Sequence, residues 1–323
     1  MPKKSNSDYC DDILVTVITA AYNSDYIMES INSVLNQTYS KIQYIIIDDG
    51  SQYFSMSKVE KFIEINKRYN LVGYIILQND KNIGTVKTLN KGIKLSKGEY
   101  IFNLAADDVF MNNDVIKGWV SKFKKERVQI LTGIRVVYDI TLNNMKCILP
   151  TADEIKILES GDSRKVFKRL LKSNFILGCC TAMSKELINE IGLYDEEYFL
   201  LEDYPLMLKL SRKGIKIGFW NQPVVKYRLG GVSTPEKFNP IYQHDSKLVL
   251  EKEILPYVRH PFYARVLYTK WEIMHKEHGN FMHLYSQIKI RNQNYLIPIL
   301  YLRYPLSFVR NVKNKAKSHF INR

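Results

Sequence analysis

The first 110 residues alternate between short apolar runs and longer segments with helical periodicity. Four runs rich in β-branched and aromatic residues predict strands at 13–23, 42–51, 71–78 and 98–104. The first is apolar at nearly every position, which is typical of a strand buried on both faces of a parallel sheet. We therefore expect a mostly parallel sheet in this half of the chain.

The segments between these strands predict helices with one buried face. Asn23 or Ser24 is expected to cap the first helix. Its apolar side chains recur at helical spacing: Ile27, Ile31, Val34 and Leu35. Two more helices are expected around 57–69 and over 85–96. Strands that alternate with helices in this way predict a doubly wound, Rossmann-like α/β half of the nucleotide-binding type.

The second half of the chain predicts mixed helices and strands. We expect a helix at 114–126, a strand at 128–139, a hairpin turn near 139–144, a connection at 150–162, an amphipathic helix at 163–174 and a strand turning into a helix that Gly192 ends. These elements predict one α/β domain over 1–240, with halves 1–110 and 111–240. A basic helical region follows over 241–323.

Charge is unevenly distributed along the 323 residues. The net charge is +14, and residues 259–323 alone hold 12 Lys and Arg against 2 Asp and Glu. The aromatic and aliphatic residues beside this basic end are typical of a helix at an anionic membrane surface. A helical subdomain packed on the core, with a solvated basic end, explains the same pattern. No nucleic-acid-binding module is recognisable, so no nucleic acid partner is expected.

The four cysteines do not indicate a metal site or a disulfide framework. Cys10, Cys147, Cys179 and Cys180 form no CxxC pair and have no histidine at ligand spacing. Reduced thiols in a cytosolic protein are expected. No signal peptide is expected at the amino terminus, and no apolar stretch approaches the length of roughly 20 residues that spans a membrane.

Two pairs of adjacent carboxylates follow predicted strands: Asp48 with Asp49, and Asp107 with Asp108. Ligands of open α/β sheets bind beyond the carboxyl ends of the strands, and Mg2+ and Mn2+ prefer oxygen ligands. Each pair also has a simpler interpretation, as a turn before glycine or as the start of a helix. No glycine-rich phosphate loop occurs, so we expect a metal on Asp107 to meet phosphate charge.

The first 110 residues resemble the donor-binding half of the family 2 inverting glycosyltransferases, which have the GT-A fold. The resemblance lies in the order and spacing of YN, DDGS, an N-x-G stretch, KGEY and a final DD. It implies that Ala20 contacts the nucleotide through its backbone and that Tyr22 packs on the base. It also implies that Asp48 hydrogen-bonds the base edge and that Asp107 ligates Mg2+ or Mn2+ on the diphosphate.

One position departs from the family pattern. The family usually has acid-x-acid-acid here, and Ala105 replaces the first acid. A ribose or metal contact from that side chain is lost, and Asp108 is expected to compensate. Lys87 either faces the diphosphate or the sugar, or is a solvated helix lysine.

The second half contains candidate catalytic residues. Glu202 and Asp203 open a predicted helix, where acids also interact favourably with the helix dipole. The resemblance implies that Asp203 is the catalytic base and that Glu202 supports it or touches the acceptor. Arg228 lies where the family often has a Tyr-Arg before a mobile loop. It either assists the phosphates or forms a salt bridge with a surface acid.

The resemblance and the tail together predict a metal-dependent hexosyl- or N-acetylhexosaminyltransferase that uses a nucleotide sugar, with UDP expected. Its expected acceptor is a lipid-linked oligosaccharide of bacterial capsule, O-antigen or exopolysaccharide synthesis. Its expected location is cytoplasmic, peripheral on the inner face of the plasma membrane. The alternative is a catalytically silent, membrane-bound assembly partner, because Ala105 replaces an acid. A sugar-phosphate nucleotidyltransferase would need a glycine-rich loop after the first strand, where the chain has AAYNS.

Overall fold

The structure is a computed structural model that describes residues 13–230, 239–261, 263–264, 266–268 and 271. The chain divides into two compact units, Met1–Ile254 and Leu255–Arg323. The first unit carries the sheet and the candidate site residues. The division of the chain at residue 240 stays a prediction.

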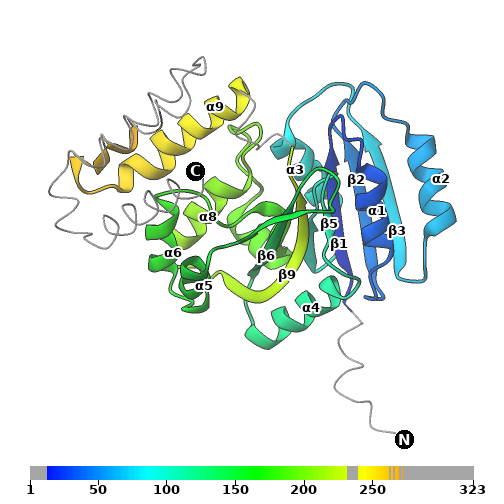
Figure 1. The fold of residues 1–323 in the computed structure, drawn as a ribbon, viewed down its shortest axis with the longest axis horizontal. Helices are drawn as coiled ribbons and strands as arrows, with labels where there is room; N and C mark the ends of the chain where they lie inside the picture. Colours follow the sequence, from blue (N-terminus) through cyan, green and yellow to red (C-terminus); the bar gives the residue numbers. More distant parts are fainter. Residues whose placement is uncertain (1–12, 231–238, 262, 265, 269–270, 272–323) are drawn as a thin grey trace, which may run out of the picture. The chain divides into compact units, whose positions relative to one another are not determined.

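The amino-terminal half of the sheet is parallel, as predicted. Its strands are β1 (Val15–Ala21), β2 (Ile42–Asp48), β3 (Leu71–Gln78) and β4 (Tyr100–Asn103), in the order β3-β2-β1-β4. The connecting helices are α1 (Ile27–Leu35), α2 (Met56–Asn66) and α3 (Thr85–Leu95). Ala21 is opposite Asp48 in the β1–β2 register, so the carboxyl ends of β1 and β2 lie side by side (Figure 1).

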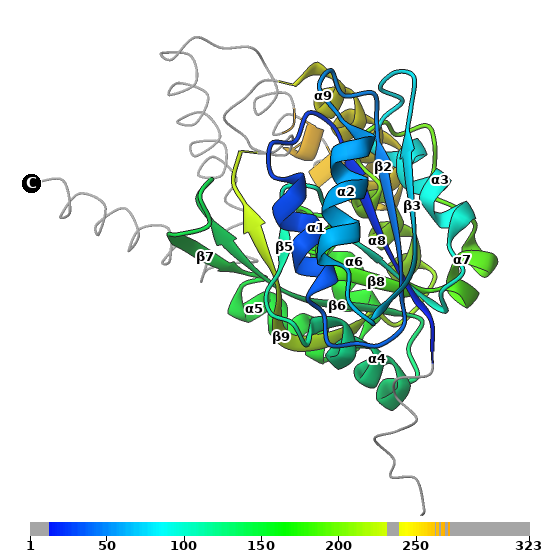
Figure 2. The same ribbon diagram turned by 90° about the vertical axis from the view of Figure 1, so that its right-hand side faces the viewer.

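The helices cover both faces of this parallel half. On one face Val17, Tyr44 and Phe102 belong to a core cluster that includes buried residues of α1, α2 and the later helix α4 (Val115–Glu126). On the other face α3 lies against β1, where a Cβ on Gly92 would come within 2.6 Å of the Ile18 side chain. Figure 2 shows α1 and α2 side by side over the sheet. The arrangement is the predicted doubly wound α/β fold.

Beyond β4 the sheet becomes mixed. The order continues β4-β8-β6-β9-β5, and β7 pairs with β6. The strands are β5 (Val109–Phe110), β6 (Ile130–Tyr138), β7 (Met145–Leu149), β8 (Thr181–Ser184) and β9 (Gly218–Arg228). The β6–β7 pair is the hairpin predicted near 139–144. Because β8 runs antiparallel between β4 and β6, this second half is joined to the parallel half in one continuous sheet.

The remaining helices of the first unit surround this second half. They are α5 (Ala152–Glu159), α6 (Ser163–Leu170), α7 (Lys185–Ile191), α8 (Asp203–Arg212) and α9 (Pro240–Leu248), with a 3-10 turn η2 (Gly178–Cys180) and a π-helical turn η3 (Val249–Ile254). Gly192 ends α7 at a φ of 85°, as predicted. In the second unit the structure describes a 3-10 turn η4 (Leu255–Tyr257) and helical residues between 261 and 271.

Two local predictions are wrong. The cap of α1 is Tyr26, because Asn23 adopts a left-handed φ of 49° and its N–H donates to Ser51 in the next strand-end loop. The segment 150–162 is not a simple connection, since it contains α5. There Thr151 and Glu154 form a capping box that stabilises the helix start.

No helix in the described part of the chain is both long enough and apolar enough to cross a membrane. Most of the basic tail from 259 to 323 lies outside the described residues. Its contact with a membrane surface therefore stays a prediction.

Candidate active site

Asp48 ends β2 as a buried carboxylate with internal partners. Ser51 donates to it from its backbone N–H at 2.9 Å and from its hydroxyl at 2.5 Å. The Gln78 amide of β3 donates at 3.1 Å. The side chain is fully buried. To hydrogen-bond with Asp48, the edge of a base would therefore have to displace the Ser51 or Gln78 donors.

Asp49 has a role that the sequence did not reveal. Its carboxylate accepts the N–H groups of Ile83 and Gly84 at 2.9 and 2.8 Å, together with the amide of Asn79 at 2.8 Å. Gly50 makes the close approach possible, because a Cβ there would lie 2.5 Å from the Lys81 backbone. Asp49 thus holds the loop before α3 against the β2 end.

Ala20 and Tyr22 occupy the β1 end. Ala20 is partly exposed near the end of the strand, and Tyr22 follows it with a side chain that is 49% exposed. An exposed ring at a strand end is free to stack on a planar base. Lys87 is exposed on α3, which fits its interpretation as a solvated helix lysine.

Asp107 and Asp108 lie between β4 and β5 in different environments. Asp107 is partly exposed, and its carboxylate accepts no hydrogen bond from another described residue. Asp108 is 1% exposed. Its Oδ1 accepts the backbone N–H of Arg228 at 2.9 Å, whereas its Oδ2 has no nitrogen or oxygen donor among the described residues. Asp108 also accepts a hydrogen bond from the Cys179 thiol, so the carboxylate of Asp107 is the one without a donor from another described residue.

Arg228 ends β9 with its guanidinium already occupied. Nε donates to the carbonyl of Asp107 at 2.8 Å, Nη1 to the carbonyl of Ile140 at 2.5 Å and Nη2 to Glu29 Oε2 at 2.7 Å. Its Cζ lies 3.8 Å from the centre of the Tyr26 ring. Arg228 is 2% exposed. This geometry favours the salt-bridge interpretation, because a diphosphate would have to displace these acceptors.

Glu202 and Asp203 lie at the start of α8, as predicted. Asp203 is 8% exposed and accepts the N–H of Gly178 at 3.0 Å and the amide of Asn174 at 3.2 Å. Glu202 is partly exposed and accepts no hydrogen bond from another described residue. Hydrogen bonds therefore fix the position of the Asp203 carboxylate, whereas no hydrogen bond from another described residue fixes that of Glu202.

The turn η2 connects two pairs of acids: Asp107 with Asp108, and Glu202 with Asp203. Gly178 binds Asp203 through its N–H, and the thiol of the next residue, Cys179, interacts with Asp108. The end of β4 makes a second link. The Asn103 amide donates to the Tyr194 hydroxyl, and after burial the Glu202 charge raises the pKa of that hydroxyl. These contacts connect Asp107 and Asp108, which follow β4, with Glu202 and Asp203 at the start of α8, and we treat the four carboxylates as bordering one region.

Burial and mutual repulsion disfavour charge on these acids. Burial and then the Asp107 charge raise the pKa of Asp108 well above its usual range. Burial, followed by the Asp203 charge, raises the pKa of Glu202 to about 8. Burial also raises the pKa of Asp203, against the opposing hydrogen bonds of Gly178 and Asn174. Groups with pKa values moved toward neutrality are suited to proton transfer.

A divalent metal is compatible with the Asp107 end of this region. Carboxylate oxygens are the ligands that Mg2+ and Mn2+ prefer, and the Asp107 carboxylate accepts no hydrogen bond from another described residue. No cluster of three or more His, Cys, Asp or Glu suited to a metal occurs in the described ranges. Substrate oxygens would therefore have to complete the coordination. Ala105, beside this pair, has a methyl group that cannot ligate.

The sequence missed two groups at this site. Gly178 has a local signal only in hindsight, as a small residue between apolar ones in ILGCC. Asp245 of α9 is fully buried and accepts three successive N–H groups, from Phe199, Leu200 and Leu201, at 2.9, 2.6 and 3.1 Å. That contact holds the segment that leads into Glu202.

Comparisons with known proteins agree with this architecture. The family model described as "Glycosyl transferase family 2" matches residues 16–192, a span that ends before Glu202. An uncharacterized glycosyltransferase of Haemophilus influenzae is 28% identical over 262 residues, which cover 76% of this chain and 74% of that protein.

Two solved structures have a similar fold. The mannosyltransferase PcManGT from Pyrobaculum calidifontis, in complex with GDP-Man and Mn2+, has a TM-score of 0.58 at 16% identity and covers 86% of this chain and 72% of its own. S. aureus TarS 1-349, in complex with UDP-GlcNAc, has a TM-score of 0.54 at 18% identity, with 81% and 72% covered. At these identities the likeness establishes the fold.

Proposed function

The chain belongs to glycosyl transferase family 2, and we propose that it is an inverting, metal-dependent enzyme that moves a sugar from a nucleotide donor to an acceptor hydroxyl. The fold is of the GT-A type. The observation that carries the proposal is the joining of two acid pairs by η2. The Asp107 carboxylate of the first pair accepts no hydrogen bond from another described residue, and burial raises the pKa values of all four acids.

The proposed reaction needs one base. Asp203, or failing it Glu202, takes the proton of the acceptor hydroxyl while that oxygen attacks the anomeric carbon from the face opposite the nucleoside diphosphate. The new carbon–oxygen bond forms as the bond to the phosphate oxygen breaks. No nucleophilic side chain is required. The Cys180 thiol and burial raise the pKa of Cys179, so that residue is not expected to act as a thiolate.

Asp107 is proposed to hold Mg2+ or Mn2+, with Asp108 beside it. A bound divalent ion would neutralise charge on the leaving diphosphate as a Lewis acid. Ala20, Tyr22 and Asp48 are proposed to bind the nucleotide. Their placement at the β1 and β2 ends supports this role. Arg228 would act on the substrate indirectly, by holding the backbone carbonyl of Asp107 and the side-chain carboxylate of Asp108.

A UDP-sugar is the proposed donor, and the transferred group is proposed to be a hexosyl or N-acetylhexosaminyl unit. Neighbours with this fold bind UDP-GlcNAc in one case and GDP-Man in another. The proposed acceptor is a lipid-linked oligosaccharide of surface polysaccharide synthesis. Its support is the resemblance and the basic tail, which would place the enzyme on the inner face of the plasma membrane.

A catalytically silent assembly partner is the second candidate function. The observation that favours it is Ala105, whose methyl group replaces an acid next to Asp107. Such a protein would bind nucleotide but would transfer no sugar.

Donor screening tests the proposal. UDP- and GDP-sugars are added with Mn2+ or with chelator, and thermal stabilisation and sugar release are measured. The proposal expects metal-dependent stabilisation and slow hydrolysis with a UDP-sugar. Stabilisation without hydrolysis or transfer favours the silent partner, and no response to any nucleotide sugar contradicts both.

A further inference from the structure

Arg135, in the middle of β6, is a cation without a hydrogen-bond acceptor among the described residues. Its Nε and Nη1 atoms are buried and make no hydrogen bond within the described part of the chain. Buried polar groups nearly always have a partner, and an unpaired cationic donor is costly to bury. Arginine cannot lose its charge to relieve that cost. Within the described residues, Nε and Nη1 of this guanidinium therefore have no acceptor.

The surroundings of Arg135 place it beside the acids of the site. Its guanidinium carbon lies 5.4 Å from the centre of the Tyr227 ring on β9. Burial raises the pKa values of Asp203 and Tyr227, and the positive charge of Arg135 lowers them. The charges of Asp108 and Asp107 also raise the pKa of Tyr227, so Arg135 and these two acids all lie near Tyr227.

Arg135 and Arg228 differ in the hydrogen bonds that their guanidinium groups make. Arg135 and Arg228 come from adjacent parallel strands, β6 and β9. The guanidinium of Arg228 has three acceptors and that of Arg135 has none among the described residues. Of these two arginines, Arg135 is the one with guanidinium donors that have no acceptor in the described part of the chain.

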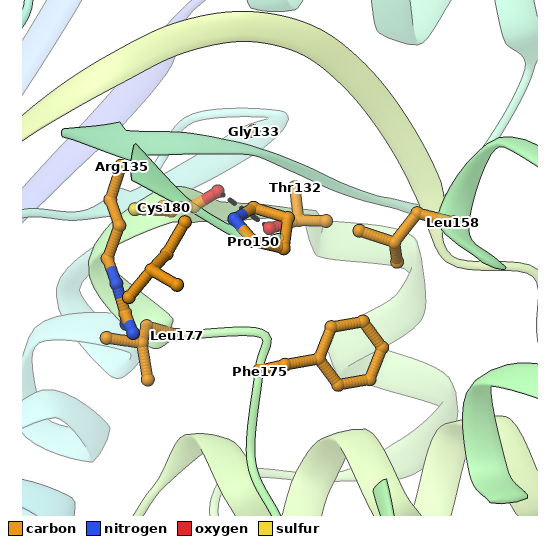
Figure 3. A pocket seen from close by; sticks show the side chains of 9 residues that line it. Thr132, Gly133, Arg135, Pro150, Leu158, Phe175, Leu177 and Cys180 are labelled. Atoms are coloured by element: carbon orange, nitrogen blue, oxygen red, sulfur yellow. Dashed lines mark hydrogen bonds between the residues drawn. The ribbon is translucent and has the colours of Figure 1, made fainter. Parts of the chain in front are cut away.

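The pocket around Arg135 has mostly apolar walls. Figure 3 shows the Arg135 side chain extending from β6 along one side of the pocket toward Leu177, with Phe175 and Leu158 further along. Apolar walls lower the effective dielectric, which strengthens the attraction between a fixed cation and an anion. A planar guanidinium fork also matches the two oxygens of a phosphate or a carboxylate.

We propose that Arg135 binds an oxyanion of the substrate, a phosphate or a carboxylate, in the region bordered by the two acid pairs. This inference rests on the proposed function and adds Arg135 to the residues that bind the substrate in it. The oxyanion has two possible sources. It is either the diphosphate of the donor or an anionic group that the acceptor carries near its reacting hydroxyl.

Chemical modification of the wild-type protein tests the site without any variant. Phenylglyoxal is applied, and the modification of each arginine is followed by mass spectrometry. Inorganic pyrophosphate is expected to protect Arg135 and to leave the exposed Arg164 reactive. If pyrophosphate and inorganic phosphate both leave the modification rate of Arg135 unchanged, the proposal is wrong.

Variants give a second measurement. In Arg135→Gln the affinity for pyrophosphate is expected to fall about tenfold or more, and Arg135→Lys should retain part of it, since charge remains without the fork. Arg164→Gln is the matched control on the surface. Unchanged pyrophosphate affinity in a folded Arg135→Gln contradicts the proposal, and if that variant does not fold the protection experiment decides.

A third measurement distinguishes the two sources. With saturating UDP and Mn2+ present, inorganic phosphate is tested for further protection of Arg135. Full protection by UDP alone, with weaker UDP binding in Arg135→Gln, identifies the donor diphosphate. Protection that requires added phosphate, with normal UDP binding in the variant, identifies an anionic acceptor. These readouts need no sugar transfer, so Arg135 can be protected even if the protein transfers nothing, and transfer can occur with Arg135 unprotected.

Discussion

The backbone N–H of Gly178 donates a 3.0 Å hydrogen bond to Oδ2 of Asp203. The same glycine lies against Glu202, because a Cβ built on it would come within 2.5 Å of Oε1. One residue of η2 thus sets the position of both carboxylates that are candidates for the base. Its neighbour Cys179 interacts with Asp108, so the turn also connects this pair with the proposed metal site.

Replacing Gly178 with alanine is expected to lower activity more than stability. The added methyl would displace the flexible end of Glu202, which can move at little cost to folding. Misplacing an acid beside the reacting groups should reduce transfer by about tenfold to a hundredfold. Thermal unfolding and steady-state rates measure the two effects. Gly73→Ala is the control, since nothing lies within 4 Å of its Cβ, and equal activity in both variants would argue against this role for the turn.

Asp203→Asn tests the base directly. Asparagine retains an oxygen for the Gly178 N–H but cannot accept the acceptor's proton. The variant should fold and bind nucleotide normally while transfer falls at least about a hundredfold. Glu202→Gln is the matched comparison, with a smaller loss expected. If transfer survives in Asp203→Asn and is lost in Glu202→Gln, Glu202 is the base.

Glu202 should make stability depend on pH. Burial and the Asp203 charge raise its pKa in the folded protein to about 8, above the ordinary glutamate value. The folded state therefore holds a proton that the unfolded chain releases, and stability from this group declines as pH rises toward about 8. Midpoints of unfolding between pH 5 and 9 measure the decline. Glu202→Gln should flatten it, and an identical profile in the variant would show that another group is responsible.

Nucleotide binding is expected to depend on Asp107 and a divalent metal. Its carboxylate has no donor from another described residue, so Asp107→Ala should fold normally and lose metal-dependent UDP binding. Calorimetric titration with UDP and Mn2+ measures this loss. Asp80→Ala, at an exposed position, is the control. UDP binding by Asp107→Ala, or by the wild type in excess chelator, would show that the metal assignment is wrong.

The basic tail is expected to bind anionic lipid. Removing the residues after about 290 should weaken binding to vesicles that contain phosphatidylglycerol, because the excess of basic residues is concentrated toward the end of the chain. Added salt should have the same effect, since charge is screened beyond about 8 Å at physiological ionic strength. Vesicle sedimentation measures both. Salt-independent binding, or no binding, favours a packed helical subdomain.

The sequence predicted the parallel half of the fold well because its signals are local. A strand such as β2 is buried along its whole length and apolar at most of its positions, and the connecting helices show their buried faces at regular spacing. The strand ends were therefore located, and Asp48 and Asp107 with them. The start of α1 was misplaced because Asn23 pairs with Ser51, a partner 28 residues away that no local rule includes.

By itself, the sequence determined the α/β architecture, the positions of the four strand-end acids and the acids that open α8, since each of these follows from patterns within about ten residues. Only the tertiary structure decided what those side chains touch. It paired Arg228 with Glu29, joined Asp203 to Gly178 and left Arg135 without an acceptor among the described residues. The physical reason is that hydrogen bonds and desolvation depend on neighbours in space, and these neighbours come from strands and turns far apart in the chain.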